Sequence, residues 1–344
     1  MLRNSLGTRF LVGIMAVFSL SMAMTGAAFA NGEVNIYSYR QPFLIKPMLN
    51  AFTHQTGIKT NVVFAPKGMI TRLQKEGRNS PADVVLTVDI GRINDAVEAG
   101  VLQPVKTKKL AANIPSHDRD PSGLWFALTR RARVVYASRE RVKPGDLSTY
   151  EALVDPKWKG RICIRSSKNA YNVALLASLV AHHGEEKAEE WARGLKANLA
   201  RKPQGNDRAQ VKAIHAGECD ISLGNSYYMG KMLTNEKQIA WAESVFLFFP
   251  NQDGRGAHMN ISGAGVTRHA PRKDNAVKLL EFLSDDLAQK MYAEQNFEYP
   301  VKPGVPWSGL VESWGRFKAD KLDMIEVARQ RATATKIFDR VGIP

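Results

Sequence analysis

The apolar positions of the chain form short β-branched runs that alternate with longer amphipathic segments. In its first part the pattern predicts strands and helices in turn, with strands at 34–39, 60–65 and 83–87 and helices at 42–54, 69–76 and 90–99. Such alternation is typical of parallel βαβ units in a three-layer α/β domain. A different stretch follows at 124–137, apolar and basic throughout, and we expect it to cross from one lobe to another.

The same alternation resumes after residue 160 and predicts a second α/β lobe. Strands are expected at 161–164 and 219–223, helices at 171–181, 185–195, 208–215 and from 228, then strands at 244–249 and 261–267 and helices at 273–282 and 286–295. We therefore expect a first lobe from 31–130 with about 250–285, a second lobe from 131–249, and C-terminal helices over 286–344 that pack on the lobes. Two such lobes leave a cleft near the carboxyl ends of strands, the usual place for a small ligand.

The first thirty residues have the features of an export signal. Arg3 and Arg9 give a basic start, residues 10–24 are mostly apolar, and Ala-Phe-Ala at 28–30 is a small-x-small cleavage site. We expect a mature chain that begins at Asn31 in the bacterial periplasm or outside the cell. A lipid anchor would need a cysteine at the cleavage point, where this chain has Asn31, and no later stretch has the roughly 18 apolar residues of a membrane span, so no membrane anchor is expected.

The net charge and the cysteines limit which classes of ligand and which covalent links are expected. The 344 residues carry a formal net charge of +15. Cleavage would remove the two arginines of the signal and leave +13, a positive charge that favours anionic ligands. Nucleic acid is not expected, because the basic residues are scattered and no basic-aromatic sheet motif is present. Cys163 and Cys219 are the only cysteines, and an oxidising compartment favours a disulfide between them, with two separate buried thiols as the alternative.

Two adjacent tyrosines, Tyr227 and Tyr228, follow a short predicted strand. A phenol with a pKa near ~10 is neutral in water, but a highly charged cation can hold it as phenolate, a hard oxygen ligand suited to Fe(III). The alternative is that the pair packs against a domain with its hydroxyls hydrogen-bonded.

Other polar residues lie where expected strands end. The loop 166–172 supplies a helix N-cap and could hold an anion or aim Tyr171 into the cleft, or it could be only a capped helix start. Arg40 and Gln41 follow the first strand. Arg131 and the arginine two positions on share one face of an extended segment, as anion clamps or as surface charges.

Catalytic motifs are scarce. Asp83 and Asp89 flank a strand, but Asp89 is expected to cap the next helix rather than to act as an acid or base. His182 and His183 lie at an expected helix end, where imidazole meets the last carbonyls. The sequence has no zinc spacing, no Gly-x-Ser-x-Gly elbow and no phosphate-binding loop, so no enzyme activity is expected.

Four segments carry a resemblance to a known family: Val-Asn-Ile-Tyr-Ser-Tyr-Arg-Gln-Pro at 34–42, Asn-Ser-Pro-Ala-Asp-Val-Val-Leu-Thr-Val-Asp at 79–89, Ala-Asn-Leu-Ala-Arg-Lys-Pro-Gln-Gly at 197–205 and Gly-Asn-Ser-Tyr-Tyr at 224–228. Together they resemble the periplasmic ferric-iron-binding proteins, the solute-binding components of Fe(III) ABC importers. The resemblance extends over about 33–314 and implies the type II periplasmic-binding fold, two α/β lobes hinged by crossing strands.

The resemblance also implies a ligand set. The consecutive tyrosines of the family match Tyr227 and Tyr228, and a third, in an Asn-x-Tyr-Asn context, matches Tyr171. Relatives often add a His and a Tyr just after the first strand, where this chain has Gln41 and Pro42.

This departure argues against a first-lobe protein ligand. The branch of the family that this chain resembles uses tyrosines alone, and the resemblance therefore implies a bound carbonate-like anion that completes the coordination sphere. Gln41, Arg40 and Arg131 are then expected to hold the anion, and Tyr39 is either an extra ligand or a packed aromatic. Fe(III), three phenolates and a carbonate together leave a charge of −2 for arginines to offset.

The function that follows is capture of Fe(III) in the periplasm and its delivery by a monomeric binding protein to an inner-membrane ABC permease, without chemistry. The rival is a carrier of phosphate, sulfate or a phosphonate on the same fold, with the arginines as primary ligands. A secreted metal-dependent hydrolase is less favoured, because tyrosine-only ligation leaves no general base.

Overall fold

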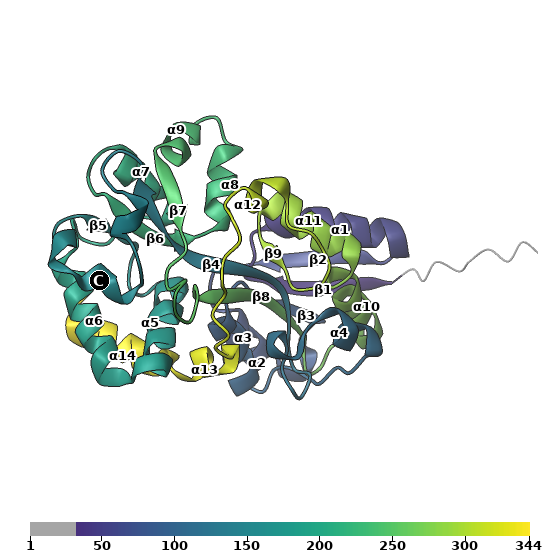
Figure 1. Cartoon of the computed structure of the whole chain (residues 1–344). Coiled ribbons are helices and arrows are strands. Elements are labelled where there is room, and N and C mark those ends of the chain that lie inside the picture. The colour runs from purple at the N-terminus through teal and green to yellow at the C-terminus, as the bar shows by residue number, and fades with distance from the viewer. Residues whose placement is uncertain (1–31) are drawn as a thin grey trace, which may run out of the picture.

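Among the described residues, one mixed sheet of nine strands runs through both halves of the molecule. The computed structural model describes residues 32–344, so the expected export signal lies outside the described residues. The strands are β1 (Glu33–Ser38), β2 (Lys59–Phe64), β3 (Val84–Leu86), β4 (Phe126–Ser138), β5 (Ile162–Cys163), β6 (Ile221–Asn225), β7 (Val245–Phe248), β8 (Met259–Val266) and β9 (Tyr299–Pro300). The main order is β2-β1-β3-β8-β4-β6-β5, with β7 and β9 paired to β4 (Figure 1).

The half of the sheet that holds the N-terminal strands has a parallel core. β1 pairs in parallel with both β2 and β3, and β8 closes this part antiparallel to β3. All three residues of β3 are buried, as expected for a strand covered on both faces. The helices of this half are α1 (Pro42–Thr56), α2 (Met69–Glu76), α3 (Ile90–Glu98), α4 (Lys108–Asn113), α10 (Lys273–Leu283) and α11 (Asp286–Asn296).

Strand β4 links the two halves of the molecule. Its first part pairs with β8 and its last part, Arg133 to Ala137, pairs antiparallel with β6. The stretch that we expected to cross between lobes is this strand, and the expected boundary at residue 130 falls inside it (Figure 1). The exact division of the chain into lobes stays a prediction.

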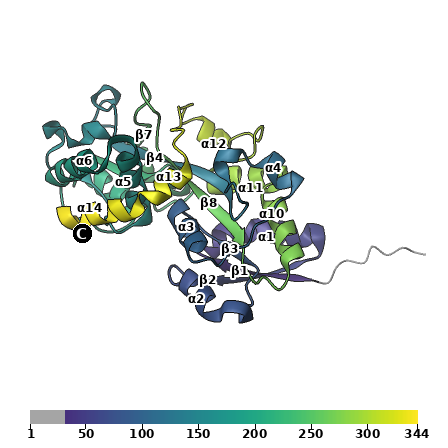
Figure 2. The same ribbon diagram turned by 90° about the horizontal axis from the view of Figure 1, so that it is seen from below.

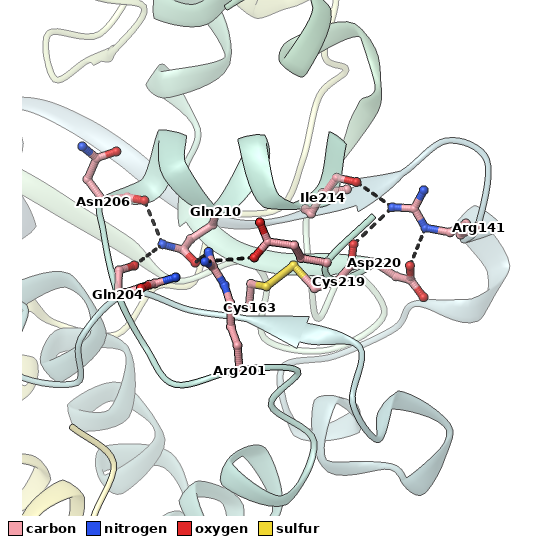
Figure 3. The surroundings of a disulfide bond; sticks show 10 residues. Arg141, Cys163, Arg201, Gln204, Asn206, Gln210, Ile214, Cys219 and Asp220 are labelled. Carbon is pink, nitrogen blue, oxygen red and sulfur yellow. Dashed lines mark hydrogen bonds and ion pairs between the residues drawn. A yellow bond between two sulfur atoms is a disulfide. The ribbon is translucent and has the colours of Figure 1, made fainter. Parts of the chain in front are cut away.

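The other half of the sheet contains β5 and β6, which are parallel, with β4 and β7 beside them. Its helices are α5 (Ala170–His183), α6 (Glu185–Ala197), α7 (Asp207–His215), α8 (Tyr227–Leu233) and α9 (Ile239–Glu243). Cys163 on β5 and Cys219 just before β6 form a disulfide with their Cα atoms 5.9 Å apart (Figure 3). The predicted disulfide is therefore confirmed.

The C-terminal segment carries α12 (Gly309–Glu312), α13 (Met324–Arg329) and α14 (Arg331–Val341). Helix α14 packs on α5 and α6, whereas α13 contacts both α5 and α3, so this segment touches both halves of the molecule (Figure 2). An arginine at the start of α14, Arg331, donates a hydrogen bond to the carbonyl of Gly91 on α3 at 2.9 Å.

Candidate metal centre

The tyrosines singled out from the sequence come together because their strands are neighbours. Strands β5 and β6 are parallel, so their carboxyl ends meet at one edge of the sheet. Tyr171 lies in the first turn of α5, the helix after β5, while Tyr227 and Tyr228 open α8 directly after β6. All three line one cavity, and we call them the tyrosine triad.

Within the tyrosine triad, the rings of Tyr227 and Tyr228 lie 4.3 Å apart at an interplanar angle of 36°. Burial raises the pKa of both phenols above the ordinary value, and the nearby hydroxyl of Tyr171 raises the pKa of each further. The positive charge of Arg131 acts in the opposite direction on the pKa of Tyr227. Without a bound cation both phenols are therefore neutral at neutral pH, and a metal would have to displace their protons.

The loop before α5 fixes the position of Tyr171. The side chain of Asn169 accepts a hydrogen bond from the Tyr171 amide at 3.0 Å, which confirms the expected N-cap. On the other side, the Asn172 side chain donates to the carbonyls of Arg165 and Ser166 at 3.0 and 3.2 Å. The loop is thus closed on itself by side chain to backbone bonds.

Arg131 on β4 is the candidate anion ligand with free donors. It is 1% exposed, and its guanidinium carbon lies 5.6 Å from the centre of the Tyr171 ring. One nitrogen, Nη1, donates to Ser262 Oγ at 3.1 Å, while Nε and Nη2 have no hydrogen-bond partner among the described residues. A buried guanidinium with two unused donors is suited to a planar oxyanion.

Arg40 and Gln41 differ from Arg131. Arg40 Nη1 donates to the same Ser262 hydroxyl at 2.7 Å and to Glu298 Oε1 at 3.2 Å, and Nη2 is also bonded to Glu298. Its charge is therefore already paired with a buried carboxylate. Gln41 lies before α1 at the cavity wall, is exposed, and makes no capping hydrogen bond with its side chain.

Tyr39 lines the same cavity but has other partners. Its hydroxyl accepts a hydrogen bond from the Ile70 amide at 3.2 Å, and the Arg92 guanidinium lies 4.8 Å from its ring centre. Both readings of this residue, ligand and packed aromatic, are compatible with a ring that is 8% exposed at the cavity wall.

The cavity has a volume of about 640 Å³ and draws its walls from both halves of the sheet. Its cationic lining residues are Arg40, Arg92, Arg131, Arg165, Arg208 and Lys231. Among the described residues that line it, Glu298 is the one carboxylate. The described lining residues thus carry an excess of positive formal charge, which favours anions.

Several of these residues were missed in the sequence. Arg165 lies two residues after the end of β5, so the rule that ligands bind at strand ends could have found it. No local signal marks Ser262 and Glu298, because they meet Arg40 only through folding, at sequence separations of 222 and 258.

The other polar candidates lie in structural roles. Asp89 caps α3 by accepting from the Arg92 amide at 3.2 Å, as predicted. His182 and His183 instead pair with Asp320 and Glu151, each at 2.7 Å, rather than with the last carbonyls of their helix. Within residues 32–344, no three His, Cys, Asp or Glu side chains gather as a metal site.

Comparison with known proteins identifies the class. The family model of the bacterial extracellular solute-binding proteins matches residues 79–314, and the chain belongs to this family. It is 48% identical to iron uptake protein A1 of Synechocystis sp. over 313 residues, 90% of this chain and 87% of that one.

Solved structures agree with this assignment. Apo ferric ion-binding protein A of Pasteurella haemolytica is 51% identical with a TM-score of 0.87, over 91% of this chain and 98% of that one. A Trichodesmium protein solved with iron and citrate ligands is 46% identical with a TM-score of 0.86, over 91% and 100%. The expected type II periplasmic-binding fold is confirmed, and the resemblance to ferric-iron-binding proteins is borne out.

Membership of the family makes the protein a periplasmic solute-binding protein, as expected from the sequence. Across residues 32–344, none of the helices combines the length and apolar character needed to cross a bilayer.

Proposed function

We propose that this protein captures ferric iron in the periplasm and delivers it to an inner-membrane ABC permease. The observation that carries the proposal is the tyrosine triad, gathered at one strand edge in a cationic cavity. Three phenolate oxygens form a hard donor set that fits Fe(III), and they would match its charge of +3. The relatives named for iron uptake and ferric-ion binding share the fold and much of the sequence.

A carbonate-like anion completes the coordination sphere in this proposal. Arg131 offers two unused N–H donors beside Tyr171, and Ser262 holds its third nitrogen at 3.1 Å. Gln41 at the cavity wall, and Arg40 through its unpartnered Nε, are the secondary candidates for the anion. Tyr39 remains the candidate for a fourth protein ligand should its bond to Ile70 break.

The protein performs no chemistry on its cargo. Closure of the two lobes around the loaded site is the signal that the permease reads, since a ligand favours the closed state only by binding it better. A monomer without a membrane anchor suffices for this cycle.

The test is the visible spectrum of the purified protein, together with its metal content. With ferric citrate and bicarbonate, we expect one iron per chain and a phenolate-to-iron charge-transfer band that is absent from the metal-free protein. A colourless protein with no bound iron would remove the proposal.

One observation favours a second candidate, a carrier of phosphate, sulfate or a phosphonate. The cavity places five arginines and a lysine around a single carboxylate, which is also what an anion site requires. Calorimetry with these anions in iron-free buffer separates the two functions. Tight binding of an anion without iron would favour the carrier, and binding of the anion only with iron would favour ferric transport.

A further inference from the structure

A buried carboxylate lies between two arginines behind the tyrosine triad. Asp207, the first residue of α7, is fully buried. Its Oδ1 accepts from Arg133 Nη1 at 2.6 Å and its Oδ2 from Arg165 Nη1 at 2.5 Å. We call these three residues the Asp207 group. Two guanidiniums and one carboxylate leave it one formal positive charge, in a place with little access to water.

The Asp207 group is bonded to both segments that carry the tyrosine triad. Arg133 Nη1 donates to the Asn225 side chain at 3.0 Å, on β6 just before the tyrosine pair. Arg133 Nη2 donates at 2.6 Å to the side chain of Asn172, the residue after Tyr171. Asn172 in turn donates to the backbone carbonyl of Arg165 at 3.0 Å. One guanidinium therefore ties the two tyrosine-bearing segments to each other.

The two arginines of the Asp207 group, together with Arg131, surround the ring of Tyr171. The guanidinium carbons of Arg131 and Arg165 both lie 5.6 Å from the centre of the Tyr171 ring, and that of Arg133 lies 6.0 Å from it. With Asp207, these three arginines have a formal net charge of +2. Fe(III), three phenolates and a carbonate would carry −2, so the two sets of charges balance.

Asp207 and Arg165 have opposite charges and act oppositely on one tyrosine of the pair, Tyr228. Behind the dominant effect of burial, the charge of Asp207 raises the pKa of Tyr228 and that of Arg165 lowers it. The charge of Arg165 thus favours the phenolate form of Tyr228, while Asp207 limits that effect and holds Arg165 in place through its hydrogen bond.

We infer that the Asp207 group is the positioning and charge-balancing element of the proposed ferric site. Its hydrogen bonds hold the two tyrosine segments at a fixed separation, and its net positive charge, with that of Arg131, offsets the iron–phenolate–anion assembly. The inference rests on the proposed function, because the charge to be offset is that of the loaded site.

The same half of the molecule contains a matched control. Asp220 also lies between two arginines, Arg141 and Arg161, each at 2.5 Å. Figure 3 shows Asp220 and Arg141 near the disulfide. None of these three residues lines the cavity. This second group has the same chemistry as the Asp207 group but is distant from the tyrosines.

The test replaces Arg165, because it is 17% exposed and so tolerates change better than Asp207. Arg165→Met removes the charge, Arg165→Lys keeps it, and Arg161→Met is the control. Iron retention is measured against a competing chelator in bicarbonate buffer, with the visible band and the thermal unfolding of each metal-free variant.

A unit charge about 6 Å from a phenolate in a protein interior changes a binding constant on the order of a hundredfold. We therefore expect Arg165→Met to weaken iron retention by roughly ten- to a hundredfold and to release iron at a higher pH. Arg165→Lys should lose less than about tenfold, because it keeps the charge. Arg161→Met should bind like the unmodified protein.

Three outcomes would overturn the inference while the proposed function stands: iron retention by Arg165→Met equal to that of the unmodified protein, equal losses in the Lys and Met variants, or an equal loss in Arg161→Met. An unmodified protein that takes up no iron and shows no band would instead overturn the proposed function, and this inference with it.

Discussion

Replacement of Arg131 by glutamine should weaken iron binding without weakening the fold. Arg131 is 1% exposed and two of its guanidinium nitrogens have no hydrogen-bond partner within residues 32–344, so its charge is buried at a cost. If a carbonate-like anion accepts from both groups, the variant loses two charged hydrogen bonds of about 1.5–3 kcal/mol each. Summed, about 3–6 kcal/mol corresponds to a loss on the order of a hundred- to ten-thousandfold in affinity.

The free energy of unfolding of the metal-free protein, unlike its iron affinity, should not fall in Arg131→Gln. Removal of a buried charge that has no ion-pair partner among the described residues relieves a desolvation cost, so the unfolding free energy should stay equal or rise. A lower iron affinity together with an equal or higher unfolding free energy distinguishes a functional arginine from a structural one. Loss of a structural arginine would lower both the iron affinity and the unfolding free energy.

The assay is competition for iron with a chelator, in bicarbonate-replete and bicarbonate-free buffer, with chemical unfolding of each metal-free variant. Arg139→Gln is the control, since Arg139 is exposed and its side chain donates to a backbone carbonyl, that of Glu243, at 3.1 Å. Reciprocal linkage requires that an anion bound only by the loaded protein raise iron affinity as much as iron raises its own. Equal iron affinity of the unmodified protein in both buffers would refute the anion role, and a less stable metal-free Arg131→Gln would refute the stability argument.

Three other predictions follow from the described residues. Tyr→Phe at each member of the tyrosine triad removes a ligand oxygen and keeps the ring, so each should weaken or blue-shift the visible band; three unchanged spectra would contradict the ligand set. Loss of the Cys163–Cys219 disulfide, which spans a separation of 56 residues, should lower the unfolding free energy by about 2–4 kcal/mol, and unreduced, denatured protein should show no free thiol. Burial, with nearby arginine charges, lowers the pKa of His258 to about 3. The unfolded chain has a histidine pKa of about 6.5, so below that pH it binds more protons than the folded protein. The unfolding free energy should therefore fall as the pH decreases from about 6.5 towards 3, by up to about 1.4 kcal/mol per pH unit. His258→Gln should flatten this slope when unfolding is measured at several pH values.

The periodic parts of the fold could be predicted because each depends on neighbours in sequence. The alternation of strands and helices, the cap at Asp89 and the start of α5 at Asn169 are all local patterns, and each is present. The disulfide followed from compartment and strand placement. The order of the strands could not be predicted from the sequence, because β8 is far along the chain from β3 and β4 and lies between them only in the folded protein.

For the candidate site, the sequence marked the residues that follow strands but not their charge partners. Tyr171, Tyr227 and Tyr228 were found by their context, and they share one cavity. The pairing of Arg40 with Glu298 could not be read, since a buried carboxylate 258 positions away leaves no pattern near Arg40. That pairing changes the chemistry, because it leaves Arg40 with one unpartnered nitrogen, Nε, whereas Arg131 has two among the described residues.

The positions of the tyrosine triad and Arg131 in the chain indicate how iron binding and closure of the lobes would be coupled. The tyrosine triad comes entirely from the strand ends of β5 and β6, so in the proposed site that half of the molecule would hold the metal by itself. Arg131 lies on β4, in the part that pairs with β8, and shares the Ser262 hydroxyl of that strand with Arg40. An anion bound to Arg131 would thus touch the metal on one side and the crossing strands on the other. Protonation of that anion would remove both contacts at once, and iron would then be held by one half alone.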